Sequence, residues 1–459
     1  MRKTNFIINR KSLKFKEGVD ERIIIYKGNE ALLNSKTTHF HVLNFEIYMN
    51  WNPTPYFELS GTCSNQIPIE HMSTEFYVTI DNLYFSNGRI IEVSDSIKVM
   101  LDFPMQNIES IQNEYVKEVK FSIVNFSVCN SSKNSDFKFK FLLEKSEENE
   151  YIEGSLIDRE CLHSVIKTLR RKGGFCITHH AHIKFAKAKS IKEVEIILER
   201  LILSLRFLNG QDLGFALLNF FNKENEIISW FPKYGNIKSY KSCHRVLLSS
   251  EIYNHPKESS ILEKMLNFFA KTNDFQTYID LIHWYCMANI NSGYTSGSLI
   301  LAQAGVELIW NFCKKTKLYG IECEMMKENN KKRKKYAGEK IGELMKALSI
   351  PNDIRKTTPH LKAYSRNYNT IHRKSKIETL SHAIVSLRNN LVHSDGKKKE
   401  DEKKKEVNIP RYAYFEARES LLLIIEKFIF NRVKFEGLYN KRHTTVEPIS
   451  WRRIEKFSN

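Results

Sequence analysis

Residues 377–393 read IETLSHAIVSLRNNLVH, and this stretch decides the fold of the second half of the chain. Its apolar residues recur at spacings of three and four, which predicts one buried stripe on an amphipathic helix: Ile377, Leu380, Ile384, Leu387 and Leu391. The same periodicity predicts helices near residues 258–272, 275–291, 296–316, 335–349, 374–393 and 410–432. The C-terminal half is therefore expected to be helical.

The end of this helix carries residues suited to cutting RNA. Arginine binds phosphate as a planar, permanently charged fork, and histidine moves protons near neutral pH. Cleavage without a metal needs a base for the 2′-hydroxyl and a group that stabilises charge on the phosphate. Both can be supplied by Arg388, Asn389 and His393. Arg388 and His393 lie about 140° apart around an ideal helix. Either the helix kinks near Asn390, or a second copy completes the site.

A second Arg–Asn pair followed by a histidine, at Arg366, Asn367 and His372, competes for this role. It follows Pro359 and lacks a strong apolar stripe before it. We therefore interpret it as a chance match.

The N-terminal half shows the alternation of half-buried strands, for example at Phe76, Val78 and Ile80. One helix is expected near residues 191–208, where Ser190 can cap its start and Gly210 lies just past its end. The predicted fold class is α+β, with an antiparallel β-rich domain over residues 1–250 and an all-α bundle over residues 251–459. The β-rich domain is expected to be a sandwich or a barrel-like sheet.

The chain of 459 residues carries a net charge of +18, which favours polyanionic partners such as nucleic acid. A lysine-rich genomic bias would give the same charge. Two basic runs interrupt the helical half, at residues 327–335 and 397–405, and each reads as a solvated loop or as a channel for the RNA backbone. The second run follows the Arg–His motif and holds the candidate RNA-binding residues Lys397, Lys398, Lys399, Lys403, Lys404 and Lys405.

Eight cysteines are scattered without C-x2-C spacing, which argues against a zinc ribbon or a disulfide framework and favours a reducing, cytoplasmic location. No secretory or membrane-spanning segment is predicted. His179, His180 and His182 invite a zinc interpretation, but alternation along a strand separates His179 from the other two. An exposed sheet edge is the favoured interpretation, and neither a metal nor a cofactor is expected.

The segment Arg388–His393 resembles the Arg-polar-x3-His signature of HEPN ribonucleases. Residues 299–310 resemble the first bundle helix of ApeA-like HEPN proteins, which act in bacterial antiphage defence by abortive infection. Residues 344–351 resemble the segment between that helix and the motif helix, and residues 203–210 extend the resemblance faintly. The resemblance implies a helical bundle in which two protomers pair their motifs in one cleft. It also implies an N-terminal domain that senses an infection signal, and it allows Glu307 to orient Arg388.

On this interpretation the chain is a metal-independent endoribonuclease that leaves 2′,3′-cyclic phosphate and 5′-hydroxyl ends. The expected partners are RNA, with tRNA as a candidate, a second copy of the chain or a higher oligomer, and a phage-derived trigger. Two alternatives remain open. One is a non-catalytic HEPN-type module for RNA binding or protein interaction, and the other, with less support, is a DNA-binding regulator.

Overall fold

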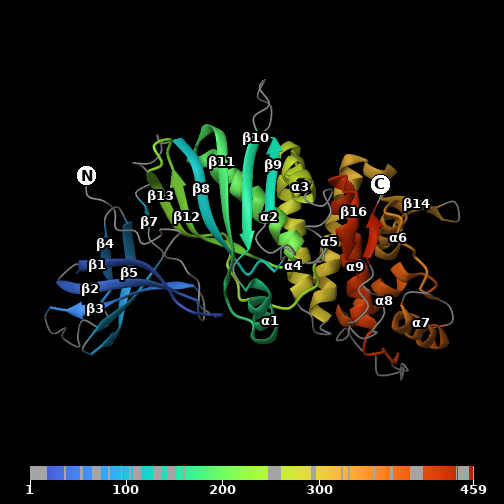
Figure 1. Cartoon of the computed structure of the whole chain (residues 1–459). Helices are drawn as coiled ribbons and strands as arrows, with labels where there is room; N and C mark the ends of the chain where they lie inside the picture. Colours follow the sequence, from blue (N-terminus) through green and yellow to red (C-terminus); the bar gives the residue numbers. More distant parts are fainter. Residues whose placement is uncertain are drawn as a thin grey trace. The chain divides into compact units, whose positions relative to one another are not determined.

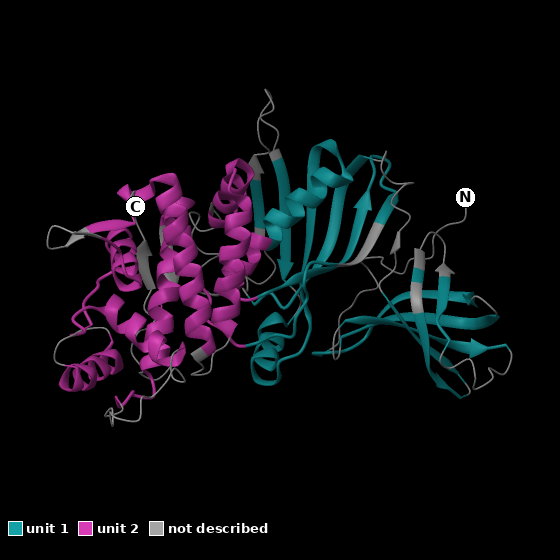
Figure 2. Ribbon diagram, turned by 180° about the vertical axis from the view of Figure 1, so that it is seen from behind, with its two compact units in different colours: residues 1–202, 212–241 teal, residues 203–211, 242–459 magenta. Residues whose placement is uncertain are grey.

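The computed structural model describes residues 18–35, 38–51, 55–64, 74–80, 83–94, 96–102, 105–106, 115–127, 137–142, 151–158, 161–246, 260–290, 296–321, 324–328, 331–354, 358–372, 376–392, 407–440, 442 and 454–457. The chain divides into two compact units, which Figure 2 colours separately. Unit 1 comprises residues 1–202 and 212–241, and unit 2 comprises residues 203–211 and 242–459.

Unit 1 is built on two antiparallel sheets, labelled in Figure 1. The seven-stranded sheet has the order β4-β1-β2-β3-β6-β5-β7 and the six-stranded sheet the order β13-β12-β8-β11-β10-β9. Their strands are β1 (Ile23–Asn34), β2 (His39–Asn50), β3 (Tyr56–Cys63), β4 (Phe76–Ile80), β5 (Leu83–Val93), β6 (Ile97–Leu101), β7 (Met105–Gln106), β8 (Tyr115–Val124), β9 (Phe137–Leu142), β10 (Tyr151–Asp158), β11 (Ile177–Ser190), β12 (Gly214–Phe221) and β13 (Ile227–Tyr234).

The core of the first sheet comes from alternating apolar residues. A bulge in β2 changes which residues of that strand face the core. Val42 is buried, and after it the buried positions are Phe45, Ile47 and Met49. The parity changes because the register with β3 shifts between Leu43 and Glu46. One extra residue in a strand turns the following side chains to the other face.

Unit 1 also contains helix α1 (Leu162–Lys172) and most of helix α2 (Ile191–Asn209). The last turns of α2 belong to unit 2. The predicted cap of α2 is confirmed. The backbone N–H of Ser190 donates to Glu193 Oε2 (2.9 Å), and Ser190 Oγ accepts from the Glu193 N–H (3.3 Å). Gly210 follows the helix with φ +74°, in the left-handed region that favours glycine.

Unit 2 is mainly helical, so the predicted α+β fold class is confirmed. Its later helices are α3 (Ser260–Lys271), α4 (Phe275–Ile290), α5 (Ser296–Thr316), α6 (Ala337–Ala347), α7 (Pro359–Ile371), α8 (Leu380–Val392) and α9 (Ala413–Arg432), with a 3-10 turn at Leu318–Gly320. Two antiparallel pairs of short strands complete the described part of unit 2. They are β14 (Met325–Glu328) with β15 (Lys331–Lys334), and β16 (Gly437–Asn440) with β17 (Ile454–Phe457). Within the described ranges, every helix is too short or too polar to cross a lipid bilayer.

Two sequence predictions for unit 2 were wrong in detail. The basic run at residues 327–335 was interpreted as a solvated loop or as a channel for the RNA backbone, and residues 327–328 and 331–334 of it lie in the paired strands β14 and β15 rather than in a loop. Residues 359–371 were not among the predicted helices. Pro359 occupies the first turn of α7, where proline has no hydrogen bond to lose.

Candidate functional site

The apolar stripe of residues 377–393 holds helix α8 in unit 2. Leu380, Ala383, Ile384 and Leu387 are buried, and α8 packs against α5, α6, α7 and α9. Ile377 is also buried but precedes the helix, where its backbone exchanges two hydrogen bonds with the side chain of Asn369. The stripe therefore fixes α8 against its neighbours.

Arg388 lies in the last turn of α8 and is half-buried. Its Nη1 donates to the carboxamide oxygen of the exposed Asn389 (3.2 Å), while its Nε is buried without a hydrogen-bond partner among the described residues. No described carboxylate forms an ion pair with it. His393 and the lysines at positions 397–399 and 403–405 lie outside the described residues.

A buried tyrosine supports the motif from the neighbouring helix α7. Tyr364 Oη shares a hydrogen bond with Ser386 Oγ (2.9 Å) and accepts one from Asn390 Nδ2 (2.9 Å). Burial raises the pKa of the Tyr364 hydroxyl, against the hydrogen bond from Ser386. This link was not predicted, because its residues are 22 and 26 positions apart and no local pattern joins them.

Glu307, expected near Arg388, lies on helix α5 and accepts a hydrogen bond from Gln303 Nε2 (2.9 Å), one turn earlier. No contact of the described residues joins Glu307 to Arg388. The side chain instead lines a groove between α5 and α6. The orienting role of Glu307 thus remains a prediction, with no contact in its support.

The competing motif occupies helix α7. Arg366 is exposed, and the ring of His372 stacks against Tyr368 with a centroid distance of 4.3 Å just past the end of the helix. Its arginine thus lies in solvent, whereas Arg388 is half-buried with an unpartnered nitrogen among the described residues.

The three histidines of β11 point to separate partners. His179 is fully buried and contacts Asp158 (3.1 Å), whereas His180 contacts Ser122 (3.1 Å) and His182 contacts Ser155 (2.9 Å). Strand β11 pairs with β8 and β10, so the expected exposed edge was wrong. In the part of the chain that the structure describes, no cluster of metal-ligating side chains gathers here or elsewhere.

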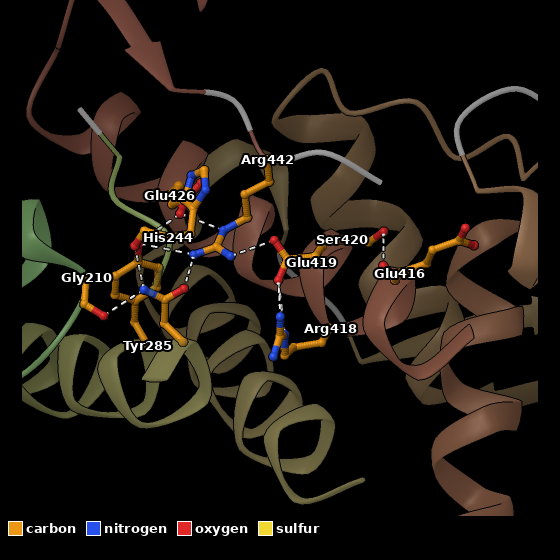
Figure 3. A network of polar contacts seen from close by, with 10 residues as sticks. Gly210, His244, Tyr285, Glu416, Arg418, Glu419, Ser420, Glu426 and Arg442 are labelled. Carbon is orange, nitrogen blue, oxygen red and sulfur yellow. Dashed lines mark hydrogen bonds and ion pairs between the residues drawn. The ribbon is translucent and has the colours of Figure 1, made fainter. Parts of the chain in front are cut away.

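A second polar cluster, not predicted from the sequence, lies buried between helices α4 and α9 (Figure 3). Arg442 is at its centre with no exposed side-chain area. Its Nη1 donates to Glu419 Oε2 (2.8 Å) and its Nε to Glu426 Oε1 (2.7 Å). Its Nη2 donates to Asn289 Oδ1 (2.6 Å) and to Tyr285 Oη (3.3 Å). We call this set the Arg442 cluster.

Further hydrogen bonds extend the Arg442 cluster to the chain around residue 210. Asn289 Nδ2 donates to the carbonyl oxygens of Gly210 (2.6 Å) and His244 (2.7 Å), as Figure 3 shows. On the other side, Arg418 Nη2 donates to Glu419 Oε1 (2.7 Å). Two arginines and two glutamates balance each other in charge, which is the condition for burying ions in a protein interior.

The two carboxyls of the Arg442 cluster titrate differently. Burial raises the pKa of Glu426 to about 7, although Arg442 and Tyr285 act to lower it. Burial acts in the same direction on Glu419, but Arg442 and Arg418 outweigh it and lower its pKa to about 2. Glu426 Oε2 has no hydrogen-bond partner among the described residues, so this glutamate is the less well satisfied of the two.

Two segments of the chain are similar to known family models. Residues 111–243 match the YopA central domain, and residues 272–452 match the YopA C-terminal domain. No curated protein and no solved structure matches the chain. The second match contains α8 and the Arg442 cluster residues from Tyr285 onward, and it names a domain without naming a reaction.

Proposed function

We propose that this chain is a metal-independent endoribonuclease whose site is formed by Arg388, Asn389 and His393. The observation that carries the proposal is the state of Arg388. It is half-buried at the end of a firmly packed helix, no described carboxylate neutralises it, and one of its nitrogens lacks a partner among the described residues. Such a guanidinium is poised to accept an anion, because phosphate binding would satisfy both its charge and its free donors.

Each residue then has a defined role in cleavage. Arg388 binds the scissile phosphate and stabilises the charge that develops on it. His393 removes the proton of the 2′-hydroxyl or protonates the leaving 5′-oxygen. Asn389, already bonded to Arg388, orients the guanidinium or contacts phosphate. Attack by the 2′-hydroxyl leaves a 2′,3′-cyclic phosphate and a 5′-hydroxyl.

The proposal includes a homodimer, because one helix does not bring Arg388 and His393 to the same phosphate. Val392, at the last position of α8, is 45% exposed, and Val385, seven residues earlier, is half-buried. An exposed apolar side chain beside a polar motif supports contact with a second motif helix. We place this enzyme in the cytoplasm, acting in antiphage defence, with unit 1 responding to a phage-derived trigger.

The test is RNA cleavage by the purified full chain in excess EDTA, with end mapping of the products. Arg388→Ala and His393→Ala are expected to abolish cleavage without changing the circular dichroism spectrum or melting temperature. Arg366→Ala is the matched control, since it removes the same charge from the exposed face of α7. Equal loss of cleavage in the control, or full activity of Arg388→Ala, would overturn the proposal.

A further inference from the structure

The groove between helices α5 and α6 has the features of a small ligand site separate from Arg388. Its volume is about 170 Å³. Glu307, Trp310 and Asn311 line it from α5, and Lys340, Ile341 and Leu344 line it from α6. Typical pockets for drug-sized ligands have ~300–1,000 Å³. The groove therefore accommodates a single ring system rather than a whole nucleotide.

The polar groups of the groove are held in place by their own interactions. Lys340 Nζ lies 4.4 Å from the centre of the Trp310 ring and is tethered by Glu324 Oε1 (3.1 Å). Trp310 Nε1 donates to Glu343 Oε2 (3.4 Å), which fixes the indole. The cation and the aromatic ring are thus positioned before any ligand arrives.

The α5 side of the groove offers hydrogen-bond acceptors at its rim. Glu307 Oε1 accepts a hydrogen bond from Nε2 of the buried Gln303, which holds the carboxylate in place. Glu307 and Asn311 are exposed at the rim of the groove, one helical turn apart. A ligand that fits this side therefore carries two or more hydrogen-bond donors on one edge.

The chemistry of the walls excludes two ligand classes. A phosphate group would be repelled by Glu307, and Lys340 is already paired with Glu324. An aliphatic chain would desolvate the carboxylate of Glu307 and the carboxamide of Asn311 without giving them new partners, which is costly. A neutral planar ring remains, with donors toward Glu307 and acceptors toward Lys340 or Asn311.

We propose that this groove binds a guanine base. Guanine presents two adjacent donors, N1–H and the N2 amino group, which match a carboxylate, and two acceptors, O6 and N7, which match Lys340 and Asn311. Single-stranded RNA is commonly recognised through splayed bases whose Watson–Crick edges are read in such pockets. Helix α8 packs on both α5 and α6, so a base bound here lies on the same group of helices as Arg388. The choice of RNA as the source of the base rests on the proposed function, but binding does not require cleavage.

Binding is measured by isothermal titration of the full chain with guanosine, inosine and adenosine monophosphates, and with short single-stranded RNAs that carry one of these bases. Inosine lacks the N2 amino group, and we expect its affinity to fall about tenfold or more, as for loss of a hydrogen bond to a charged group. Tight binding of RNA alone identifies an RNA subsite. Equal binding of the free monophosphate identifies a nucleotide site, and both results support guanine as the ligand.

The variant Glu307→Gln should remove the preference for guanine over inosine, while the control Glu378→Gln, an exposed residue before α8, should leave it unchanged. Equal affinity for adenosine and guanosine, no binding of either, or an unchanged preference in Glu307→Gln would overturn the proposal. Arg388→Ala is expected to retain guanine binding. Cleavage that survives Arg388→Ala together with Glu307-dependent guanine binding would refute the assignment of the cleavage site to Arg388 and leave the guanine proposal standing.

Discussion

Truncation of Arg442 to alanine should destabilise unit 2 severely and in a pH-dependent way. The variant removes donors to Glu419, Glu426, Tyr285 and Asn289 at once. Glu419 keeps its hydrogen bond from Arg418, but Glu426 keeps only the hydroxyl of Tyr285 (2.8 Å). Breaking a buried ion pair from one side costs about 3–5 kcal/mol, because a charge is left without compensation. We expect a destabilisation of this size at pH 8.

The pH dependence follows from the pKa of Glu426. In the wild-type protein its folded pKa, about 7, lies above the unfolded value near 4.5, so the folded state binds more protons between these limits. Stability from this group is complete below about pH 4.5, decreases as the pH rises to 7, and is constant above 7. Without Arg442 the pKa rises further, and stability continues to fall by about 1.4 kcal/mol per pH unit above 7.

The assay is urea denaturation followed by circular dichroism at pH 6 and pH 8. The difference in unfolding free energy between wild type and Arg442→Ala should be larger at pH 8 by about 1.4 kcal/mol. Arg366→Ala, an exposed arginine of the same unit, should change stability by less than about 0.5 kcal/mol at both pH values. A destabilisation by Arg442→Ala that is identical at pH 6 and pH 8, or no larger than the control, would refute the charge-pairing account.

Three further predictions concern the proposed site. Neutralising the lysines at positions 397–399 and 403–405 should lower the log–log salt slope of RNA binding by about 0.7 for each phosphate that is no longer neutralised, and an unchanged slope measured by fluorescence anisotropy would make the run a solvated loop. Val392→Glu should yield monomers in light scattering and abolish cleavage together, so an active monomer would contradict the shared-cleft hypothesis. Tyr364→Phe removes only the hydroxyl that joins α7 to the motif helix, and it should lower kcat with little change in KM while costing about 1 kcal/mol of stability. If KM rises and kcat does not change, the hydroxyl does not position the reacting groups.

Most of the fold that could be predicted follows from the local spacing of apolar and capping residues. The buried stripe of α8, the capping of α2 and the strand alternation of unit 1 each depend on residues within a few positions of one another. Helix α7 was missed because no strong apolar stripe precedes its Arg–Asn pair, although Pro359 suits the first turn of a helix. There the backbone N–H groups of His360 and Leu361 also donate to the carboxylate of Glu416, on α9, which local sequence cannot show.

Helix α9 shows why the buried cluster escaped prediction. Its charged residues Glu416, Arg418, Glu419 and Glu426 interrupt an apolar run and read as a solvent-facing side, yet all are buried. Their partners lie far away in sequence, such as Tyr285, 141 residues from Glu426. Charge is normally a marker of the surface, and only the structure reveals where it has been neutralised in the interior.

The comparison of Arg442 with Arg388 separates a structural arginine from a candidate functional one. Arg442 has two carboxylates and two further acceptors around it, so its charge serves to hold α4 and α9 together. Arg388 has one neutral acceptor, Asn389, and its buried Nε makes no hydrogen bond within the described residues. Under the proposed function, an anion bound at Arg388 would supply the acceptors that the described residues do not.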